Sequence, residues 1–206
     1  RGLGDVYKRQ ALTGDMTNME TMFALKEFFE KTIRSENLDS RVDNLYVNTS
    51  DRENYLLNSS IEGIEDSDLI ILIGANPRFE ATMLNSRIRK AYLNNHTDIF
   101  CLGDVGDLNY PYEVLDNSTK TIKDIVNHTH RISEKIHNSK KPIFLIGQSA
   151  LKLKSSPFLF EELKKYLIKN NKINDNWNAL NILSNDASTV GSNSVSYTHL
   201  RAHETS

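Results

Sequence analysis

The sequence predicts an α/β protein whose parallel sheet has helices on both faces. The first observation is three short apolar runs, at residues 69–73, 99–102 and 143–146, that contain no charged residue. Such runs, when rich in β-branched residues, are typical of strands buried on both faces. The second observation is that a glycine follows each run directly. The third is that segments with helical periodicity separate the runs, and this alternation favours a parallel sheet with right-handed crossovers.

Four segments have apolar residues at helical spacing: residues 19–33, residues 83–92, residues 122–136 and a segment that begins at Ser156. In the last of these, proline follows a capping residue, which is typical of a helix start. Two other segments have weaker patterns. We expect a short strand at residues 45–47 and a polar loop at residues 170–178.

The composition excludes several classes of function. Lys plus Arg number 25 against 27 Asp plus Glu, so the net charge is −2 and gives no general attraction to nucleic acid or anionic lipid. No apolar run approaches the roughly 20 residues of a membrane-spanning helix, so we expect no direct membrane insertion. No apolar signal-peptide core is present, so we expect an intracellular protein. The single cysteine, Cys101, lies in an apolar stretch and predicts a buried small side chain.

Both ends of the chain differ in composition from the body. Residues 1–10 are basic and glycine-rich, and residues 195–206 contain His199 and His203. Both segments resemble translated library-adapter sequence, so we expect them to be non-native. Residues 11–194 would then form one α/β domain fragment, with an incomplete sheet. For this reason we assign no metal site to the histidine pair, although its i, i+4 spacing on a helix would suit one.

The loops after the three predicted strands are where a ligand would bind, because ligands of open parallel sheets lie beyond the carboxyl ends of the strands. These loops are residues 74–80, 103–112 and 147–151. In the first, a glycine turn and a proline precede a helix start, which can offer N–H groups to an anion. The dinucleotide GxGxxG pattern and the Walker lysine are absent.

The charged residues near the first loop have two interpretations. Arg78 or Arg87 could hold a phosphate or carboxylate, or they could pair with Glu80 or with a neighbouring subunit, which we favour. His128 and His130 are two residues apart, so on a helix they would point to different faces and would not form a metal pair. We recognise no catalytic nucleophile arrangement and no metal-ligand spacing.

Seven segments, taken in order, resemble the G subunit of NADH:quinone oxidoreductase, which is the large (75 kDa) iron–sulfur subunit of respiratory complex I. They are METMFALK (19–26), IEGIEDSD (61–68), GANPRFEA (74–81), LNSRIRK (84–90), LNYPYE (108–113), PIFLIGQ (142–148) and WNALN (177–181). Ordered matches over nearly all of residues 11–194 are more specific than any single motif.

The resemblance implies a fragment of the molybdopterin-oxidoreductase-like domain of that subunit. In active relatives a Gly-x-Asn-Pro loop helps to bind a pterin guanine dinucleotide, and this loop maps to Gly74, Asn76 and Pro77. The Asp-Pro-Arg type segment of active relatives is replaced by GDVGD at residues 103–107. The resemblance therefore implies a vestigial cofactor-binding loop, with no cofactor, metal ligand or catalytic residue in this chain. The 4Fe–4S and 2Fe–2S clusters of the family belong to an N-terminal part of the subunit.

The function implied by the resemblance is that of a scaffold in the hydrophilic arm of complex I, which transfers electrons from NADH to quinone. Its partners would be other hydrophilic-arm subunits. Its location would be the peripheral arm, on the cytoplasmic face of a bacterial inner membrane or the matrix side of a mitochondrion. Two alternatives stay open: a fragment of an active molybdopterin-dependent oxidoreductase of the formate dehydrogenase type, and a free-standing nucleotide-binding α/β module.

Overall fold

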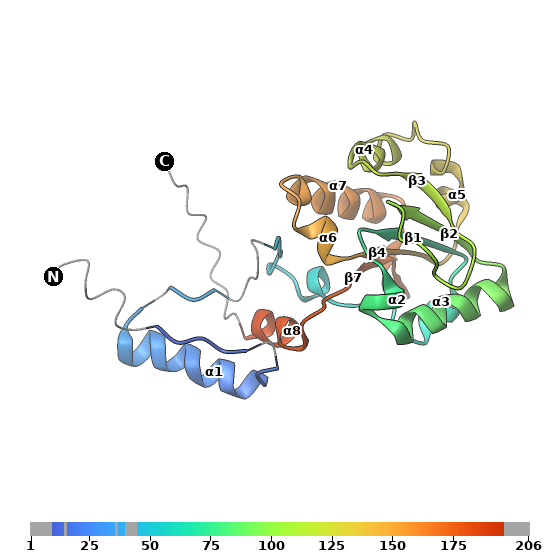
Figure 1. The fold of residues 1–206 in the computed structure, drawn as a ribbon. Helices are drawn as coiled ribbons and strands as arrows, with labels where there is room; N and C mark the ends of the chain where they lie inside the picture. Colours follow the sequence, from blue (N-terminus) through green and yellow to red (C-terminus); the bar gives the residue numbers. More distant parts are fainter. Residues whose placement is uncertain (1–9, 15, 36, 40–44, 196–206) are drawn as a thin grey trace. The chain divides into compact units, whose positions relative to one another are not determined.

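The computed structural model in Figure 1 describes residues 10–14, 16–35, 37–39 and 45–195. The chain divides into two compact units, residues 1–40 with 186–206 and residues 41–185. The segments expected to be non-native lie outside the described residues except for Gln10 and Val195, and His199 and His203 also lie outside them. The boundaries at residues 11 and 194 stay a prediction.

The larger unit is built on a five-stranded parallel sheet with the strand order β3-β2-β1-β4-β7. The strands are β1 (Leu69–Ile73), β2 (Asp98–Leu102), β3 (Glu113–Asp116), β4 (Pro142–Ile146) and β7 (Leu180–Ile182). All three predicted apolar runs are strands, and every residue of β1 and β4 is buried. The predicted fold class is confirmed, whereas the expectation of an incomplete sheet stays a prediction.

Helices cover both faces of this sheet (Figure 1). They are α2 (Pro77–Glu80), α3 (Thr82–Asn95), α4 (Lys120–Val126), α5 (Ser133–Asn138), α6 (Gln148–Leu151) and α7 (Ser156–Lys169). α3 lies on one face, and α4, α5 and α7 lie on the other. The reason is topological: the chain moves outward from β1 to β3 and then returns to β4 on the other side of β1. Right-handed crossovers in opposite directions place their helices on opposite faces.

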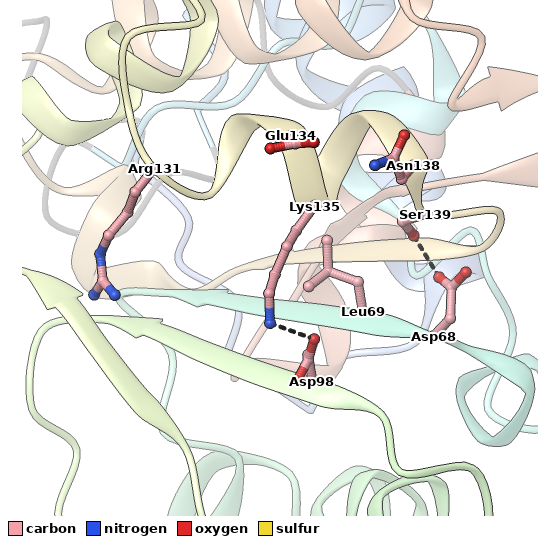
Figure 2. Close-up of a pocket in the computed structure, with 8 residues that line it drawn as sticks. All are labelled: Asp68, Leu69, Asp98, Arg131, Glu134, Lys135, Asn138 and Ser139. Carbon is pink, nitrogen blue, oxygen red and sulfur yellow. Dashed lines mark hydrogen bonds and ion pairs between the residues drawn. The ribbon is translucent and has the colours of Figure 1, made fainter.

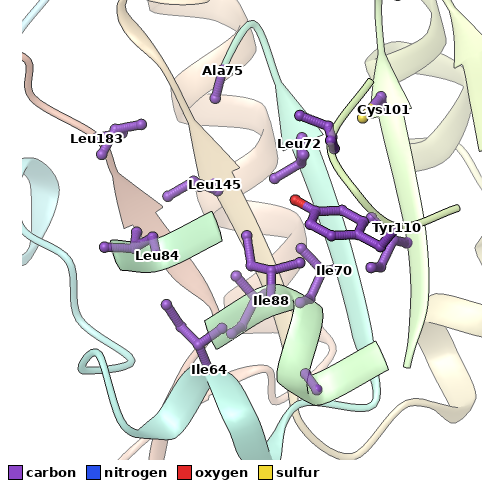
Figure 3. Close-up of a cluster of buried hydrophobic side chains, with 14 residues drawn as sticks. Ile64, Ile70, Leu72, Ala75, Leu84, Ile88, Cys101, Tyr110, Leu145 and Leu183 are labelled. Carbon is purple, nitrogen blue, oxygen red and sulfur yellow. The ribbon is translucent and has the colours of Figure 1, made fainter. Parts of the chain in front are cut away.

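The core on the α3 side is made by alternate residues of the central strands. Ile70 and Leu72 of β1 pack with Leu84 and Ile88 of α3 (Figure 3). Cys101 of β2 belongs to the same cluster and is fully buried. Burial raises the pKa of its thiol to about 12, so Cys101 acts as a small apolar side chain, as predicted.

The predicted helix at residues 122–136 was wrong, because the segment forms two helices, α4 and α5. The chain turns at His128, where φ is +59°, and the N–H groups of Thr129 and His130 both donate to the carbonyl of Asp124. Thr129 and His130 have low helix propensity, and their backbone N–H groups are hydrogen-bonded in this turn. The isoleucines of α4 and those around α5, Ile122, Ile125, Ile132 and Ile136, are all buried. The helical spacing of apolar residues in the sequence therefore continues across the turn at His128.

Two other expectations were also wrong. Residues 45–47 form no strand: Leu45 and Val47 are buried, but the backbone bonds to the α6 helix end, where Tyr46 N–H donates to the Leu151 carbonyl over 3.0 Å. Residues 170–178 are more than a loop, because they contain the antiparallel hairpin of β5 (Ile173–Asn174) and β6 (Trp177–Asn178). The remaining short elements of this unit are 3₁₀ turns at Arg52–Tyr55 and Gly63–Asp66.

The smaller unit contains α1 (Met19–Glu27), a π-helical continuation at Phe28–Ile33, and α8 (Ala187–Ser194). The predicted helix at residues 19–33 is therefore confirmed. Met22 and Leu38 are the buried residues of its apolar cluster. In the part of the chain that the structure describes, no helix combines the length and the apolar character needed to cross a bilayer.

The amino-terminal edge of the sheet is fastened by Asp68, which directly precedes β1. Its carboxylate accepts a hydrogen bond from the Ser139 hydroxyl (Figure 2). It also accepts from the backbone N–H groups of Lys140 (2.6 Å) and Lys141 (3.1 Å). These three residues form the turn between α5 and β4. The contact therefore sets where β4 begins relative to β1.

Asp68→Ala should lower the free energy of unfolding by about 1–2 kcal/mol, because three donors lose a charged acceptor. Chemical denaturation of the wild type and the variant measures the difference. The matched control is Asp66→Ala, which removes a carboxylate that has only an exposed ion pair with Lys141 (3.1 Å) and should change stability by less than about 0.5 kcal/mol. Equal losses in the two variants would contradict the fastening role of Asp68.

Candidate functional site

The three loops singled out from the sequence meet at one edge of the sheet. β2, β1 and β4 are neighbours, and they are parallel, so residues 74–80, 103–112 and 147–151 all follow carboxyl ends at the same edge. The direction of the chain reverses between β1 and β4, which makes this the switch point at which open α/β sheets bind ligands. The described contacts show how these loops are arranged.

Gly74 and Gly147 bring the backbones of two loops into direct contact at the switch point. The Gly147 N–H donates to the carbonyl of Ile73 over 2.9 Å. A Cβ on Gly147 would clash with the Gly74 carbonyl oxygen, and a Cβ on Gly74 would lie 2.5 Å from the backbone nitrogen of Ala150. Gly74 also has a φ of +58°, which glycine adopts without strain. Packing therefore requires both glycines, and protein backbone fills this part of the edge.

Asn76 and Pro77 begin α2, and the Asn76 side chain is bound to the neighbouring loop. Its Nδ2 donates to the carbonyl of Val105 over 3.0 Å. Its Oδ1 is buried and has no hydrogen-bond partner among the described residues. Pro77 is buried at the first turn of the helix, as its fixed φ suits. Among Gly74, Asn76 and Pro77, only Asn76 has a polar side chain that could bind a ligand. Its donor, Nδ2, is already bound to the Val105 carbonyl.

Glu80 ends the same turn in an unusual environment. Its carboxyl group accepts a hydrogen bond from the N–H of Asn76, but Oε2 is buried and has no partner among the described residues. Burial raises the pKa of this carboxyl group, and the hydrogen bond from Asn76 only partly opposes the shift. Two hydrogen-bond acceptors, Asn76 Oδ1 and Glu80 Oε2, are therefore buried and unpaired in one short turn.

Both arginines form ion pairs within the chain, but not with the expected partner. Arg78 donates to Asp107, at 2.7 Å from Oδ2 and 2.6 Å from the backbone carbonyl. Arg87 pairs with Glu65, which also lies 3.4 Å from Lys90. The expected pairing with Glu80 was wrong, because Glu80 turns back to the start of its own helix.

The inner part of the 103–112 loop is held by a buried polar pair that the sequence reasoning missed. Asn85 donates from Nδ2 to the carbonyl of Leu108 (3.1 Å), and its Oδ1 accepts the hydroxyl of Tyr110 (2.7 Å). Burial raises the pKa of Tyr110 well above its usual value. The available signal was spacing: Asn85 stands three residues before Ile88 and seven before Tyr92, at the edge of the apolar face of the predicted helix.

These residues do not fit an anionic dinucleotide. The side-chain donors nearest the turn, on Asn76 and Arg78, are bound to the 103–112 loop. The unpaired groups are acceptors, which would repel phosphate oxygens. Asp104 and Asp107 add two carboxylates on the same loop, and hydrogen bonds from backbone N–H groups keep the pKa of each below its usual value. The local charge is thus unfavourable for a pyrophosphate.

The described chain also has pockets away from this edge, among them one of about 930 Å³ whose lining includes Glu53, Lys141 and Trp177. No group of three or more His, Cys, Asp or Glu side chains suited to a metal ion occurs among the described residues. His128 lies in the break between α4 and α5, not on a helix, and its ring packs on Tyr166 at a centroid distance of 5.3 Å. A pocket of about 490 Å³ lies at the opposite, amino-terminal edge of the sheet (Figure 2). Within it, Lys135 is paired with Asp98 at 2.7 Å.

Gly147→Ala should lower the free energy of unfolding by at least about 2 kcal/mol, since the new methyl group would meet backbone atoms that cannot rotate away. Thermal or chemical denaturation measures the change. Gly14→Ala is the control, because a Cβ there would have no atom of the described residues within 4 Å, and it should shift stability by less than about 0.5 kcal/mol. A Gly147→Ala variant as stable as the wild type would contradict the close approach.

Glu80→Gln should stabilise the protein by about 1 kcal/mol at pH 7, because a buried unpaired carboxylate oxygen is replaced by a neutral group. The pKa of Glu80 is raised on folding, so its charge disfavours the folded state only above the ordinary value of 4.5 and increasingly as pH rises through the folded pKa. The gain should therefore vanish near pH 4. Denaturation at several pH values measures it, with exposed Glu134→Gln as the control. A gain that does not depend on pH would refute this explanation.

The comparisons with known proteins show the family of the chain. Residues 5–205 match the family described as Molybdopterin oxidoreductase. The chain is 35% identical over 193 residues to the NADH-ubiquinone oxidoreductase 75 kDa subunit of Reclinomonas americana, covering 87% of this chain and 28% of the relative. It is 30% identical over 179 residues to the mitochondrial NADH dehydrogenase [ubiquinone] iron-sulfur protein 1 of Solanum tuberosum, with coverages of 87% and 24%.

A bacterial relative is similar to the same extent. The G subunit of the NADH-quinone oxidoreductase of Rickettsia prowazekii is 33% identical over 184 residues, which cover 89% of this chain and 27% of the relative. The chain thus spans about a quarter of the length of the curated relatives it matches. The resemblance inferred from the seven sequence segments is confirmed. The chain belongs to the molybdopterin oxidoreductase family, in a region similar to the 75 kDa and G subunits of NADH:quinone oxidoreductases.

Proposed function

We propose that this chain is a scaffold domain in the hydrophilic arm of a respiratory NADH:quinone oxidoreductase. The observation that carries the proposal is the mutual binding of the loops at the switch point. Asn76 and Arg78, the side chains that could hold an anionic ligand, are bound to Val105 and Asp107. A sheet edge whose side-chain donors are occupied in this way would support its neighbours without binding an anionic cofactor of its own.

The electron-transfer centres of the enzyme would lie elsewhere in the parent subunit. One relative is named an iron-sulfur protein, whereas the described residues here contain no group suited to a metal. We therefore assign the 4Fe–4S and 2Fe–2S clusters to a part of the parent subunit outside this chain. Gly74, Asn76 and Pro77 are proposed to be a vestigial pterin-dinucleotide loop, and no residue of the chain is proposed to be catalytic.

The partners proposed for the domain are other hydrophilic-arm subunits. Several relatives are named as subunits, which supports a role within an assembly. The corresponding location is the peripheral arm, on the cytoplasmic face of a bacterial inner membrane or the matrix side of a mitochondrion. The domain boundaries proposed for the native part of the chain are residues 11 and 194.

A second candidate is a fragment of an active molybdopterin-dependent oxidoreductase, such as a formate dehydrogenase-like enzyme. The family match favours it. So do the two unpaired acceptors, Asn76 Oδ1 and Glu80 Oε2, because a pterin carries N–H donors. The occupied donors and the carboxylates of the 103–112 loop favour the scaffold instead.

The test is purification of the affinity-tagged parent subunit at full length, followed by subunit identification and metal analysis. We expect the other hydrophilic-arm subunits to co-purify, with abundant iron and far less than one molybdenum per chain.

Asn76→Ala should leave the NADH:quinone activity of the complex unchanged. The matched variant Asn58→Ala also removes an amide that donates to backbone carbonyls, those of Glu53 (2.8 Å) and Leu180 (2.6 Å), away from this edge.

Three outcomes would argue against the scaffold. A parent subunit isolated without partners would remove the assembly role. Molybdenum near one atom per chain, lost in Asn76→Ala but retained in Asn58→Ala, would establish the second candidate. Loss of activity in Asn76→Ala alone, at normal subunit composition, would show that the loop acts in the reaction.

A further inference from the structure

We propose that a groove at the amino-terminal edge of the sheet binds an arginine side chain presented by a partner polypeptide. This groove, called the hairpin groove below, has a volume of about 930 Å³. Its lining includes the loop at residues 58–60, the β5–β6 hairpin, and residues of the segments that precede β1 and β4. Because β1, β4 and β7 are parallel neighbours, the segments before them meet at one edge, which is opposite to the switch point.

Hydrogen bonds fix the walls of the hairpin groove. Buried Asn181 of β7 accepts the N–H of Ser59 (2.8 Å) and donates from Nδ2 to the Ser59 hydroxyl oxygen (2.9 Å). The same hydroxyl donates to the carbonyl of Asn178 over 2.7 Å, which joins the loop to β6. In the hairpin turn, Asn174 Oδ1 accepts the N–H of Trp177 over 3.0 Å. The shape of the groove is therefore set by the fold, which lowers the cost of binding.

The charged groups of the hairpin groove are unbalanced. Three carboxylates and one ammonium group line it, those of Glu53, Asp66, Asp175 and Lys141, so the formal charge of the lining is −2. Asp66 is paired with Lys141 at 3.1 Å. Glu53 accepts only the neutral amide of Asn178 (3.0 Å), and Asp175 has no ion-pair partner among the described residues. Two carboxylates are thus without a cation, and a positively charged group would complement them.

The uncharged part of the lining favours a guanidinium group. The chain itself already places a cation on an aromatic ring here, because Lys141 Nζ lies 5.5 Å from the centroid of the Trp177 ring. Ile168 is 53% exposed, and with the partly buried Ile173 it adds apolar surface to the groove. A guanidinium is planar and weakly hydrated, so it packs on such surfaces while it donates two parallel N–H groups to one carboxylate. An ammonium group has neither property.

The exposure of the rim favours a polypeptide over a small free cation. Most of the residues that line the groove are exposed, including Glu53, Asp66 and Asp175. A small cation would stay hydrated among them and gain little from each ion pair. A polypeptide segment contacts the rim with several residues and shields the ion pairs of its arginine from water. This inference rests on the contacts of the groove and does not depend on the proposed scaffold role.

Tryptophan fluorescence tests the proposal, because Trp177 is the only tryptophan of the chain. The full 206-residue chain is titrated with the capped peptide Gly-Ser-Arg-Ser-Gly at constant ionic strength. We expect a saturable change in the emission of Trp177. The same peptide with lysine in place of arginine, and N-acetylarginine amide alone, should each bind at least roughly threefold more weakly. The peptide with glutamate at that position should give no saturable change.

Glu53→Gln keeps an acceptor for the Asn178 amide and should weaken binding of the arginine peptide by roughly two- to fivefold. If this variant does not fold, Asp175→Asn should act in the same direction. Glu113→Gln is the matched control, since it removes the same charge from β3, at the other end of the strand order, and should leave binding unchanged.

The absence of a saturable change with the arginine peptide would overturn the proposal. Equal weakening by Glu53→Gln and Glu113→Gln would reduce the effect to the overall charge of the chain and would also overturn it. A lysine peptide that binds as tightly as the arginine peptide would contradict the guanidinium preference. N-acetylarginine amide that binds as tightly as the peptide would contradict a polypeptide partner.

Discussion

The larger unit depends on β1, a strand of five uncharged residues with bonded neighbours on both sides. Each residue from Leu69 to Ile73 is paired in register with one residue of β2 and one of β4. All five are buried, and their side chains alternate between the two helix-covered faces. In a strand without an exposed face, a polar side chain is costly unless it is hydrogen-bonded, as Asn181 is in β7. Polar groups are therefore confined to its two ends, where Asp68 and Gly74 lie.

The two ends of β1 are held to β4 by different kinds of contact. At the amino end, Asp68 accepts three hydrogen bonds from one turn and so aligns β4 with β1. At the carboxyl end, two glycines let the backbones of neighbouring loops touch. The contact at Asp68 joins a charged carboxylate to hydrogen-bond donors. The contact at the two glycines forms because neither residue has a side chain. The glycine contact explains why protein backbone fills part of the edge at which open α/β sheets bind ligands.

The unpaired acceptors of Asn76 and Glu80 are the one place where the described part of the unit leaves buried polar atoms unsatisfied at this edge. Native structures tolerate few such atoms, and those that persist call for a physical explanation. The loop after β2 binds Asn76 through Nδ2 and supplies no donor to its Oδ1. Val105 of this loop packs against the apolar core, and Leu108 and Asn85, which anchor the loop, are buried. The result is an edge at which the side-chain donors of Asn76 and Arg78 are occupied and two buried acceptors are not.

The sequence by itself determined the elements that depend on local composition. The apolar runs defined β1, β2 and β4, because residues buried on both faces must all be apolar, and the neighbours of Cys101 predicted its burial. The ordered segments also identified the family, because they preserve its residues in sequence. The site residues Gly74, Asn76 and Pro77 could be placed at a strand end for the same reason, although their role could not.

Only the tertiary structure decided which polar groups meet. Arg78 binds Asp107 rather than Glu80, because the loop after β2 reaches the start of α2, 29 residues earlier in the chain. The clash that requires Gly147 arises from Gly74, which is distant in sequence and adjacent in the sheet. The break at His128 and the hairpin of β5 and β6 depend likewise on backbone hydrogen bonds that periodicity does not report. The burial of a residue in a central strand can be predicted from its own apolar character and that of its neighbours in the sequence. Which polar groups pair depends instead on strand order and loop geometry.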